Sequence, residues 1–116
     1  MELREYIRDI PDFPKEGIMF KDITPLLADP IALQESISQL AKRFADCQAT
    51  KILGAEARGF IFGAALACEM EMGVVPVRKP GKLPYETLEA TYDLEYGTDT
   101  LCIHKDAISE GETVLI

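Results

Sequence analysis

Apolar residues recur at helical spacing between residues 30 and 46 of the chain. The members of this apolar face lie three or four positions apart or side by side: Leu33, Ile37, Leu40, Ala41 and Phe44. Such spacing places them on one side of an α-helix. Asp29 and Pro30, just before the run, are residue types favoured at a helix N-cap and first turn. The pattern therefore predicts a helix over about residues 30–46.

Two short apolar runs, residues 51–55 and 74–77, have the length of buried β-strands. Between them, residues 60–67 are apolar on nearly every side of a helix, so we expect this helix to be buried. Strand, helix and strand in this order are typical of a βαβ unit with a parallel sheet. The predicted fold class is therefore α/β, with a parallel sheet.

A different pattern begins at Thr87, where apolar and polar residues alternate as far as Tyr96. This period of two predicts an antiparallel strand with one solvated face. Gly97 predicts a turn, and residues 100–104 predict the returning strand of a hairpin. A further apolar strand is expected to begin at Thr113.

The N-terminal segment is the least regular part of the chain. Residues 2–8 have apolar side chains at helical spacing and predict a short helix, which Pro11 ends. Residues 11–25 contain three prolines and Gly17 among phenylalanine, isoleucine and methionine side chains. A loop so rich in apolar residues is unusual, because loops generally lie on the surface. It predicts either a packed lid or a segment that contacts a ligand.

The chain has 116 residues, which is the size of one domain, and a formal net charge of −8. So acidic a chain is not expected to coat nucleic acid, although a local basic patch could bind a small anion. We expect neither a membrane span nor a signal peptide, since no apolar run has the required length and the N-terminus is charged. Cys47, Cys68 and Cys102 are odd in number and widely spaced, which disfavours a disulfide framework or a zinc site and fits a cytoplasmic protein.

Two segments offer groups that could bind an anion. The turn at residues 54–59 joins a predicted strand to a helix, whose N-terminal N–H groups attract negative charge, and Arg58 adds a guanidinium. Arg78, Lys79 and Lys82 follow the next strand, at the sheet edge where α/β proteins bind ligands. These three cations suggest a polyphosphate clamp. The alternatives are an ordinary turn in which Arg58 pairs with an acidic residue, and a solubilising surface loop.

Two further residues could contribute chemistry. Glu95 lies on the polar side of the predicted hairpin, where it could act as a general acid or base, or could simply be solvated. Phe20, in the apolar loop, could stack on a flat base or fill the core. His104 is the only histidine, so neither a Ser–His–Asp triad nor a histidine metal cluster is expected.

Residues 13–27, with the sequence FPKEGIMFKDITPLL, resemble the N-terminal signature of adenine phosphoribosyltransferases. Residues 56–63 (EARGFIFG), 78–84 (RKPGKLP) and 92–97 (YDLEYG) resemble further motifs of the same family, in the same order. The resemblance implies a type I phosphoribosyltransferase fold. We therefore expect a parallel sheet flanked by helices, a small N-terminal hood and a flexible antiparallel hairpin.

The resemblance further implies purine salvage, in which adenine and 5-phosphoribosyl 1-pyrophosphate give AMP and pyrophosphate. Mg²⁺ is the implied cofactor, brought with the phosphoribosyl pyrophosphate and not held by side chains of this chain. Glu95 and Arg58 are the implied catalytic residues, with Glu95 on the flexible hood near the purine N7. The implied substrate-binding residues are Met19, Phe20, Lys21, Glu56, Ala57, Arg58, Arg78, Lys79, Lys82 and Tyr96.

The same resemblance implies a role for each group of residues. Phe20 stacks on adenine, while the backbone of Met19 and Lys21 recognises the edge of the base. The turn at residues 56–58 binds pyrophosphate and contains a non-proline cis peptide. The basic residues of segment 78–82 grip the diphosphate, partly across the interface of a homodimer.

The family's loop for the ribose hydroxyls and 5′-phosphate is expected after the strand that begins at Thr113. We therefore expect residues 1–116 to be the N-terminal part of a single phosphoribosyltransferase domain, with the C-terminal core strands absent. Residues 1–27 would form the base-binding hood segment and residues 28–116 the core, with the hairpin at 85–104. This chain alone is expected to make AMP poorly or not at all.

Three other functions remain open at this point. The chain could act on another purine base, although the base loop resembles the adenine type. It could be a non-catalytic purine-binding or regulatory protein that kept the purine loop. It could also be a degenerate fragment without activity.

Overall fold

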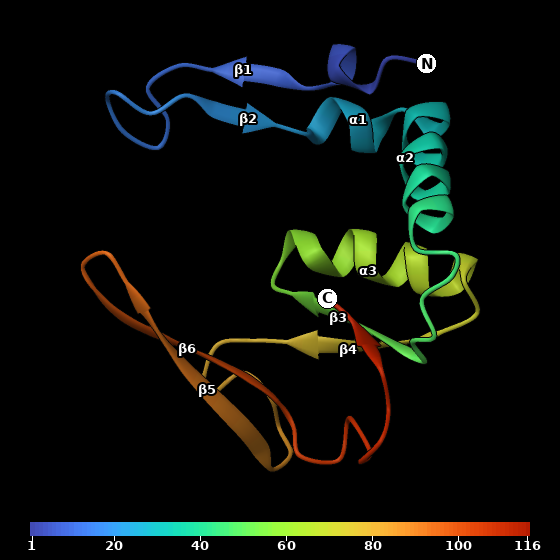
Figure 1. Ribbon diagram of the computed structural model, residues 1–116. Coiled ribbons are helices and arrows are strands. Elements are labelled where there is room, and N and C mark those ends of the chain that lie inside the picture. The colour runs from blue at the N-terminus through green and yellow to red at the C-terminus, as the bar shows by residue number, and fades with distance from the viewer. The chain divides into compact units, whose positions relative to one another are not determined.

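The computed structural model describes all 116 residues and divides them into two compact units, Met1–Arg43 and Phe44–Ile116 (Figure 1). Both predicted classes of element are present, since the chain contains helices and strands. None of the helices combines the length and the apolar character needed to cross a membrane.

The first unit begins with a two-stranded antiparallel sheet. A 3₁₀ turn, η1 (Leu3–Tyr6), precedes strand β1 (Arg8–Ile10), which pairs with β2 (Phe20–Asp22). The predicted helix over residues 2–8 is therefore wrong beyond its first turn, and the predicted loop over 11–25 contains a strand. Ion pairs across the two strands explain the difference, because a local helix would forgo them. They join Arg8 to Asp22 at 3.3 Å and Lys21 to Asp9 at 2.5 Å.

The same unit ends in two helices, α1 (Thr24–Ala28) and α2 (Pro30–Arg43). The predicted helix over residues 30–46 is confirmed, and it ends three residues earlier than expected. Asp29 caps it, because its carboxylate accepts hydrogen bonds from the backbone of Ile31 at 3.0 Å and Ala32 at 2.8 Å. Such a cap satisfies N–H groups that have no partner within the helix.

The second unit is built on a parallel βαβ motif, as the sequence predicts. Strand β3 (Lys51–Ala55) leads through helix α3 (Arg58–Glu69) to strand β4 (Gly73–Val77), which pairs with β3 in parallel. The last strand, β7 (Val114–Leu115), pairs with the other edge of β3 and gives the order β4–β3–β7. Helix α3 lies along this sheet (Figure 1).

Helix α3 is less buried than its composition predicts. Only Gly63, Leu66 and Ala67 are buried, and Ile61 remains 44% exposed. The physical reason is that the helix packs on the sheet with one face. Gly63 lies on that face, where an added Cβ would come within 3.7 Å of Ile52 and Val74 side chains. The other faces of α3 are also apolar, but the sheet does not cover them, so their side chains are less buried.

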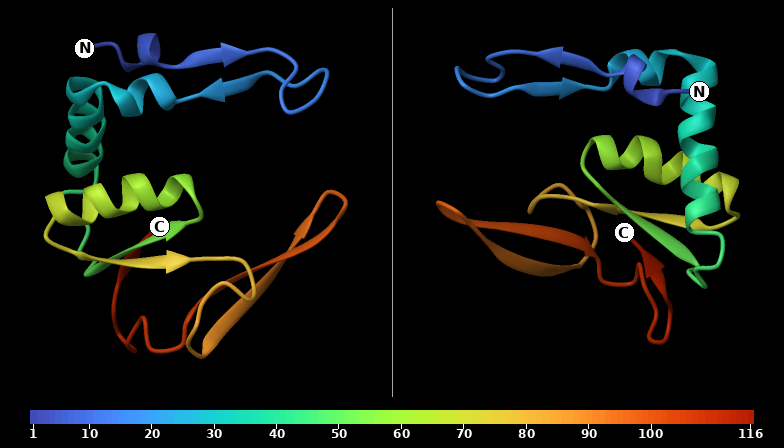
Figure 2. Two further views of the ribbon diagram at one scale, coloured as in Figure 1. Left: turned by 180° about the vertical axis from the view of Figure 1, so that it is seen from behind. Right: turned by 45° about the horizontal axis from the view of Figure 1, so that its top comes forward.

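The predicted hairpin is present and projects from the β3–β4–β7 sheet (Figure 2). Its turn is formed by Glu95 and Tyr96, so the turn predicted at Gly97 is wrong, and Gly97 begins the returning strand. Strands β5 (Thr87–Leu94) and β6 (Gly97–His104) pair in antiparallel register along their whole length. The expectation of one buried face is wrong for β5, because Leu88 is 52% and Leu94 50% exposed. A two-stranded ribbon has no second layer along most of its length, so both faces of β5 meet solvent.

The turn from β3 into α3 depends on a close approach of two glycines. A Cβ atom built on Gly54 would lie 2.6 Å from the carbonyl oxygen of Gly59, which is far inside van der Waals contact. Gly54 is buried near the end of β3, and the atoms that the added Cβ would meet belong to the backbone, which cannot rotate away as a side chain can. Only glycine therefore lets the first turn of α3 close over the end of β3.

We predict that Gly54→Ala destabilises the protein by roughly 1–3 kcal/mol, because the backbone of the β3–α3 turn must shift. The matched control is Gly73→Ala in the paired strand, where the added Cβ meets nothing closer than 3.6 Å. Urea unfolding at pH 7 measures both variants. The control is expected within about 0.5 kcal/mol of the parent. Equal stability of the two variants would contradict the steric role of Gly54.

A second tertiary contact ties the start of β3 to the segment before β7. The Glu112 carboxylate accepts hydrogen bonds from Ser109 N at 2.6 Å, Thr50 Oγ1 at 2.9 Å and Lys51 Nζ at 3.0 Å. These donors, the Ser109 backbone foremost, lower the pKa of Glu112 from 4.5 to about 2. The folded protein therefore holds Glu112 as a carboxylate more strongly than the unfolded chain does.

This shift predicts a pH-dependent contribution to stability. The folded-state pKa is the lower one, so the contribution is complete above about pH 5 and is lost as pH falls from 4.5 towards 2. We expect Glu112→Gln to lower the urea midpoint at pH 7, and the difference from the parent to shrink steadily below pH 4.5. Glu110→Gln, an exposed neighbour in the same turn, serves as the control. A difference that stays constant down to pH 2.5 would assign the effect to packing and not to charge.

Candidate functional site

The β3–α3 turn carries the first group of predicted ligand-binding residues. Glu56 and Ala57 form the turn and Arg58 begins α3. The peptide bond between Glu56 and Ala57 is cis, which agrees with the peptide that the family resemblance implies. Ala57 gives the helix no side-chain cap, so no side chain of the N-cap competes for the first N–H groups of α3.

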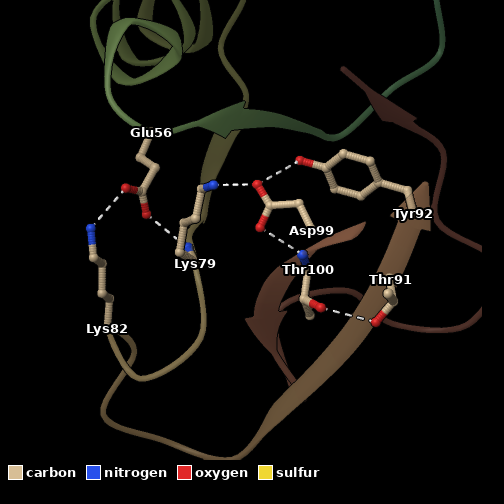
Figure 3. A network of polar contacts seen from close by, with 7 residues as sticks. All are labelled: Glu56, Lys79, Lys82, Thr91, Tyr92, Asp99 and Thr100. Atoms are coloured by element: carbon tan, nitrogen blue, oxygen red, sulfur yellow. Dashed lines mark hydrogen bonds and ion pairs between the residues drawn. The ribbon is translucent and has the colours of Figure 1, made fainter. Parts of the chain in front are cut away.

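The Glu56 carboxylate gathers the basic segment that follows β4. It accepts hydrogen bonds from Lys79 N at 2.7 Å and Lys82 Nζ at 2.9 Å (Figure 3). Arg78 Nε lies 3.6 Å from the same carboxylate. The backbone N–H of Lys79, followed by Lys82, lowers the pKa of Glu56. Glu56 is therefore an anion that brings the side chains of Arg78 and Lys82 together at the carboxyl end of the sheet, and it holds Lys79 by its backbone.

Arg78 also contacts the first turns of α3. Its guanidinium carbon lies 6.0 Å from the centre of the Phe60 ring, within range of a cation–π contact. Its Nη1 donates to the Lys82 carbonyl at 3.4 Å, while the buried Nε has no hydrogen-bond partner. Arg78 thus joins the basic segment to α3 without using all of its donors.

The Lys79 side chain leaves this cluster and meets the hairpin. Its Nζ donates to Asp99 Oδ2, and this hydrogen bond raises the pKa of Lys79 and lowers that of Asp99 (Figure 3). Asp99 is the residue that sequence reasoning missed. Its position in the strand gave no signal, because a lone acidic residue near a turn normally faces solvent.

The predicted acidic residue of the hairpin stands elsewhere. Glu95 and Tyr96 form the two-residue turn that connects β5 and β6, and both are exposed, Tyr96 by 90%. Neither takes part in the contacts around Glu56. The structure therefore places these two residues at the tip of the hairpin, apart from the basic segment.

The predicted base-binding residues lie in the first unit. Phe20 and Lys21 belong to β2, and Met19 precedes the strand with its side chain 54% exposed. The Phe20 ring meets the edge of the Phe13 ring at a centroid distance of 5.1 Å. The Lys21 ammonium is held by the carboxylate of Asp9. The structure therefore brings two aromatic rings and an ion pair together on the β1–β2 hairpin.

A further pocket of about 460 Å³ opens on the same unit. Its lining residues come from η1, β1, β2 and the segments beside them: Arg4, Ile7, Asp9, Lys21 and Ile23. The lining therefore combines three charged side chains with two isoleucines.

Clusters of side chains that could ligate a metal ion were sought over the whole chain. No three histidine, cysteine, aspartate or glutamate residues lie close enough together to hold a metal ion.

The structure is that of an α/β protein with a basic segment at the carboxyl end of its parallel sheet. Adenine phosphoribosyltransferase from Solidesulfovibrio magneticus is 66% identical over all 116 residues, which make up 68% of its length. The enzyme of the same name from Maridesulfovibrio salexigens is also 66% identical, with the same coverage. The chain belongs to the adenine phosphoribosyltransferase family.

Solved structures agree with this assignment. The adenine phosphoribosyltransferase of Thermoanaerobacter pseudethanolicus superimposes with a TM-score of 0.92 at 58% identity, over 97% of this chain and 65% of the other. The yeast enzyme, solved with adenine and an imino-altritol bisphosphate, gives 0.87 at 42% identity, over 97% and 66%. The predicted phosphoribosyltransferase-like fold is thereby confirmed. The chain spans about two thirds of the length of these relatives, and no protein-family model matches it.

Proposed function

We propose that this chain carries the adenine-binding and diphosphate-binding parts of an adenine phosphoribosyltransferase. The reaction is adenine plus 5-phosphoribosyl 1-pyrophosphate to AMP plus pyrophosphate, a step of purine salvage. The observation that carries the proposal is the 66% identity to adenine phosphoribosyltransferases along all 116 residues. The adenine bound by the yeast relative supports the choice of base.

The basic segment suits the diphosphate. Breaking the bond between ribose and pyrophosphate leaves negative charge on the leaving group, and positioned cations stabilise that charge. The stabilising positive charge would come from Arg78, Lys79 and Lys82. Arg58 and the N–H groups at the start of α3 would add to it. Mg²⁺, bound to the phosphoribosyl pyrophosphate, would neutralise further phosphate charge.

The β1–β2 hairpin suits the base. Phe20 would stack on adenine, and its edge contact with Phe13 limits the orientations of its ring. The backbone of Met19 and Lys21 would recognise the edge of the base by hydrogen bonds. Glu95, at the tip of the β5–β6 hairpin, would interact with purine N7, with Tyr96 next to it.

The setting of the reaction is proposed on family grounds as well. A homodimer in the cytoplasm fits an enzyme of this family, and the three cysteines of the chain are all free. Neither nucleic acid nor a membrane is proposed as a partner.

The base site predicts a preference for adenine. We expect the 116-residue protein to bind adenine more tightly than hypoxanthine or guanine in isothermal titration calorimetry. Phe20→Leu should weaken adenine binding about tenfold, because loss of a stacked ring typically costs 1–3 kcal/mol. Phe44→Leu, outside the base loop, is the control and should bind as the parent does. Tighter binding of hypoxanthine or guanine would point to a transferase for another purine, and no purine binding at all would contradict the base site.

The diphosphate site predicts a role for the Lys82 ammonium beyond its contact with Glu56. With inorganic pyrophosphate and MgCl₂ in the titration, we expect Lys82→Gln to weaken binding about fivefold. Lys42→Gln, an exposed lysine in the last turn of α2, removes the same charge and should change the affinity little. Added NaCl should weaken binding to the parent, as it screens exposed charges. Equal affinities of the two variants would assign Lys82 to the Glu56 contact alone.

A further inference from the structure

The β1–β2 sheet presents different side chains on its two faces. Successive residues of a strand point to opposite faces, and residues paired across an antiparallel sheet share a face. Ile10 lies opposite Phe20 in the register, and Asp9 lies opposite Lys21 and forms an ion pair with it. The Phe20 ring and this ion pair are therefore on opposite faces. The pocket of about 460 Å³ opens on the face of Lys21, because Asp9 and Lys21 line it and Phe20 does not.

The guanidinium of Arg4 is a cation of this pocket that no carboxylate neutralises. The two ion pairs of the first unit are made by other cations, Arg8 and Lys21. The backbone of Arg4 is held on both sides, since its N–H donates to Glu2 Oε1 at 3.2 Å and its carbonyl accepts from Ile7 N at 3.1 Å. Arg4 thus starts from a fixed point on the pocket wall with its charge available to an anion.

The rest of the lining defines what kind of anion fits. Ile7 and Ile23 are half-buried and give the pocket an apolar wall. Asp9 neutralises Lys21, so one positive charge is left among the three charged side chains of the lining. A guanidinium binds carboxylate and phosphate oxygens through paired hydrogen bonds. A molecule with an acidic group at one end and an apolar body matches both parts of this lining, and the volume is that of a small-molecule site.

We propose that this pocket is a second ligand site, for a small organic anion whose acidic group binds Arg4 and whose apolar body lies against Ile7 and Ile23. The site is separate from the proposed base site, which uses the Phe20 ring on the other face of the sheet. The two sites share strand β2, and each takes its ligand from its own side. The second site therefore does not depend on the proposed function.

Sodium benzoate is the probe for this site, because it joins one carboxylate to a small apolar ring. In an NMR titration of the isotope-labelled 116-residue protein, we expect millimolar benzoate to shift the backbone amide signals of residues 4–9 and 21–23. Benzamide keeps the ring without the charge, and acetate keeps the charge without the ring. Each should bind at least about tenfold more weakly than benzoate, since each satisfies only one part of the lining.

The variant Arg4→Gln tests the charge in the same titration. We expect it to weaken benzoate binding about tenfold, because the amide cannot form the charged pair of hydrogen bonds with the carboxylate. Arg8→Gln is the matched control, since it removes an equal charge from the opposite face of β1. Arg43→Gln, at the exposed end of α2, is a second control that leaves the sheet intact. Both controls should bind benzoate within about twofold of the parent.

A competition with adenine separates the two sites. The shifts caused by benzoate should persist in excess adenine, because the two ligands use opposite faces of the sheet. If adenine abolishes them, benzoate occupies the base site and the second site is wrong. Equal affinities of Arg4→Gln and the two controls, or no shifts in residues 4–9 and 21–23 at millimolar benzoate, would also overturn it. Failure of adenine to bind would count against the base site alone.

Discussion

The carboxylate of Glu56 is the interaction on which the candidate site depends. It lies directly after β3, in the turn that only the close approach of Gly54 and Gly59 allows. From there it accepts hydrogen bonds from the backbone of Lys79 and the side chain of Lys82, residues that are 23 and 26 positions away in the sequence. One anion therefore fixes the segment after β4 against the end of β3. Without it, the positive charges of Arg78 and Lys82 on one short loop would lack the carboxylate that offsets their repulsion.

Much of the fold can be predicted from the sequence because it follows from local patterns. The apolar spacing of α2 and its Asp29 cap lie within one stretch of the chain. The strand–helix–strand order of β3, α3 and β4 is likewise visible in consecutive residues. The alternating residues of β5 predict a strand but not its burial, since burial depends on a second layer. The N-terminal strand β1 was missed for a related reason. Its ion pairs with β2 are tertiary contacts that compete with a plausible local helix.

The residues of the candidate site also fall into those that local sequence indicates and those that only the folded structure reveals. Motif resemblance points to Arg58, Arg78, Lys79 and Lys82, and the basic segment is visible from composition alone. The sequence does not show that carboxylates organise these cations. Glu56 is contacted from far along the chain, and Asp99 depends on the strand register that places Tyr92 opposite it. Such roles arise only when separate elements are brought together by folding.

Internal carboxylates also bear on which anions such a site can hold. In the ligand-free protein, Glu56 and Asp99 already neutralise much of the charge of the basic segment. A singly charged anion attracts each lysine no more strongly than the carboxylate that it would displace. The carboxylate is also held in place by hydrogen bonds of the protein, which a free anion lacks. A diphosphate carries several charges on one rigid group and can contact more than one cation at once. At the proposed diphosphate site, this arrangement would lower total affinity and would favour multiply charged phosphate ligands over simple anions.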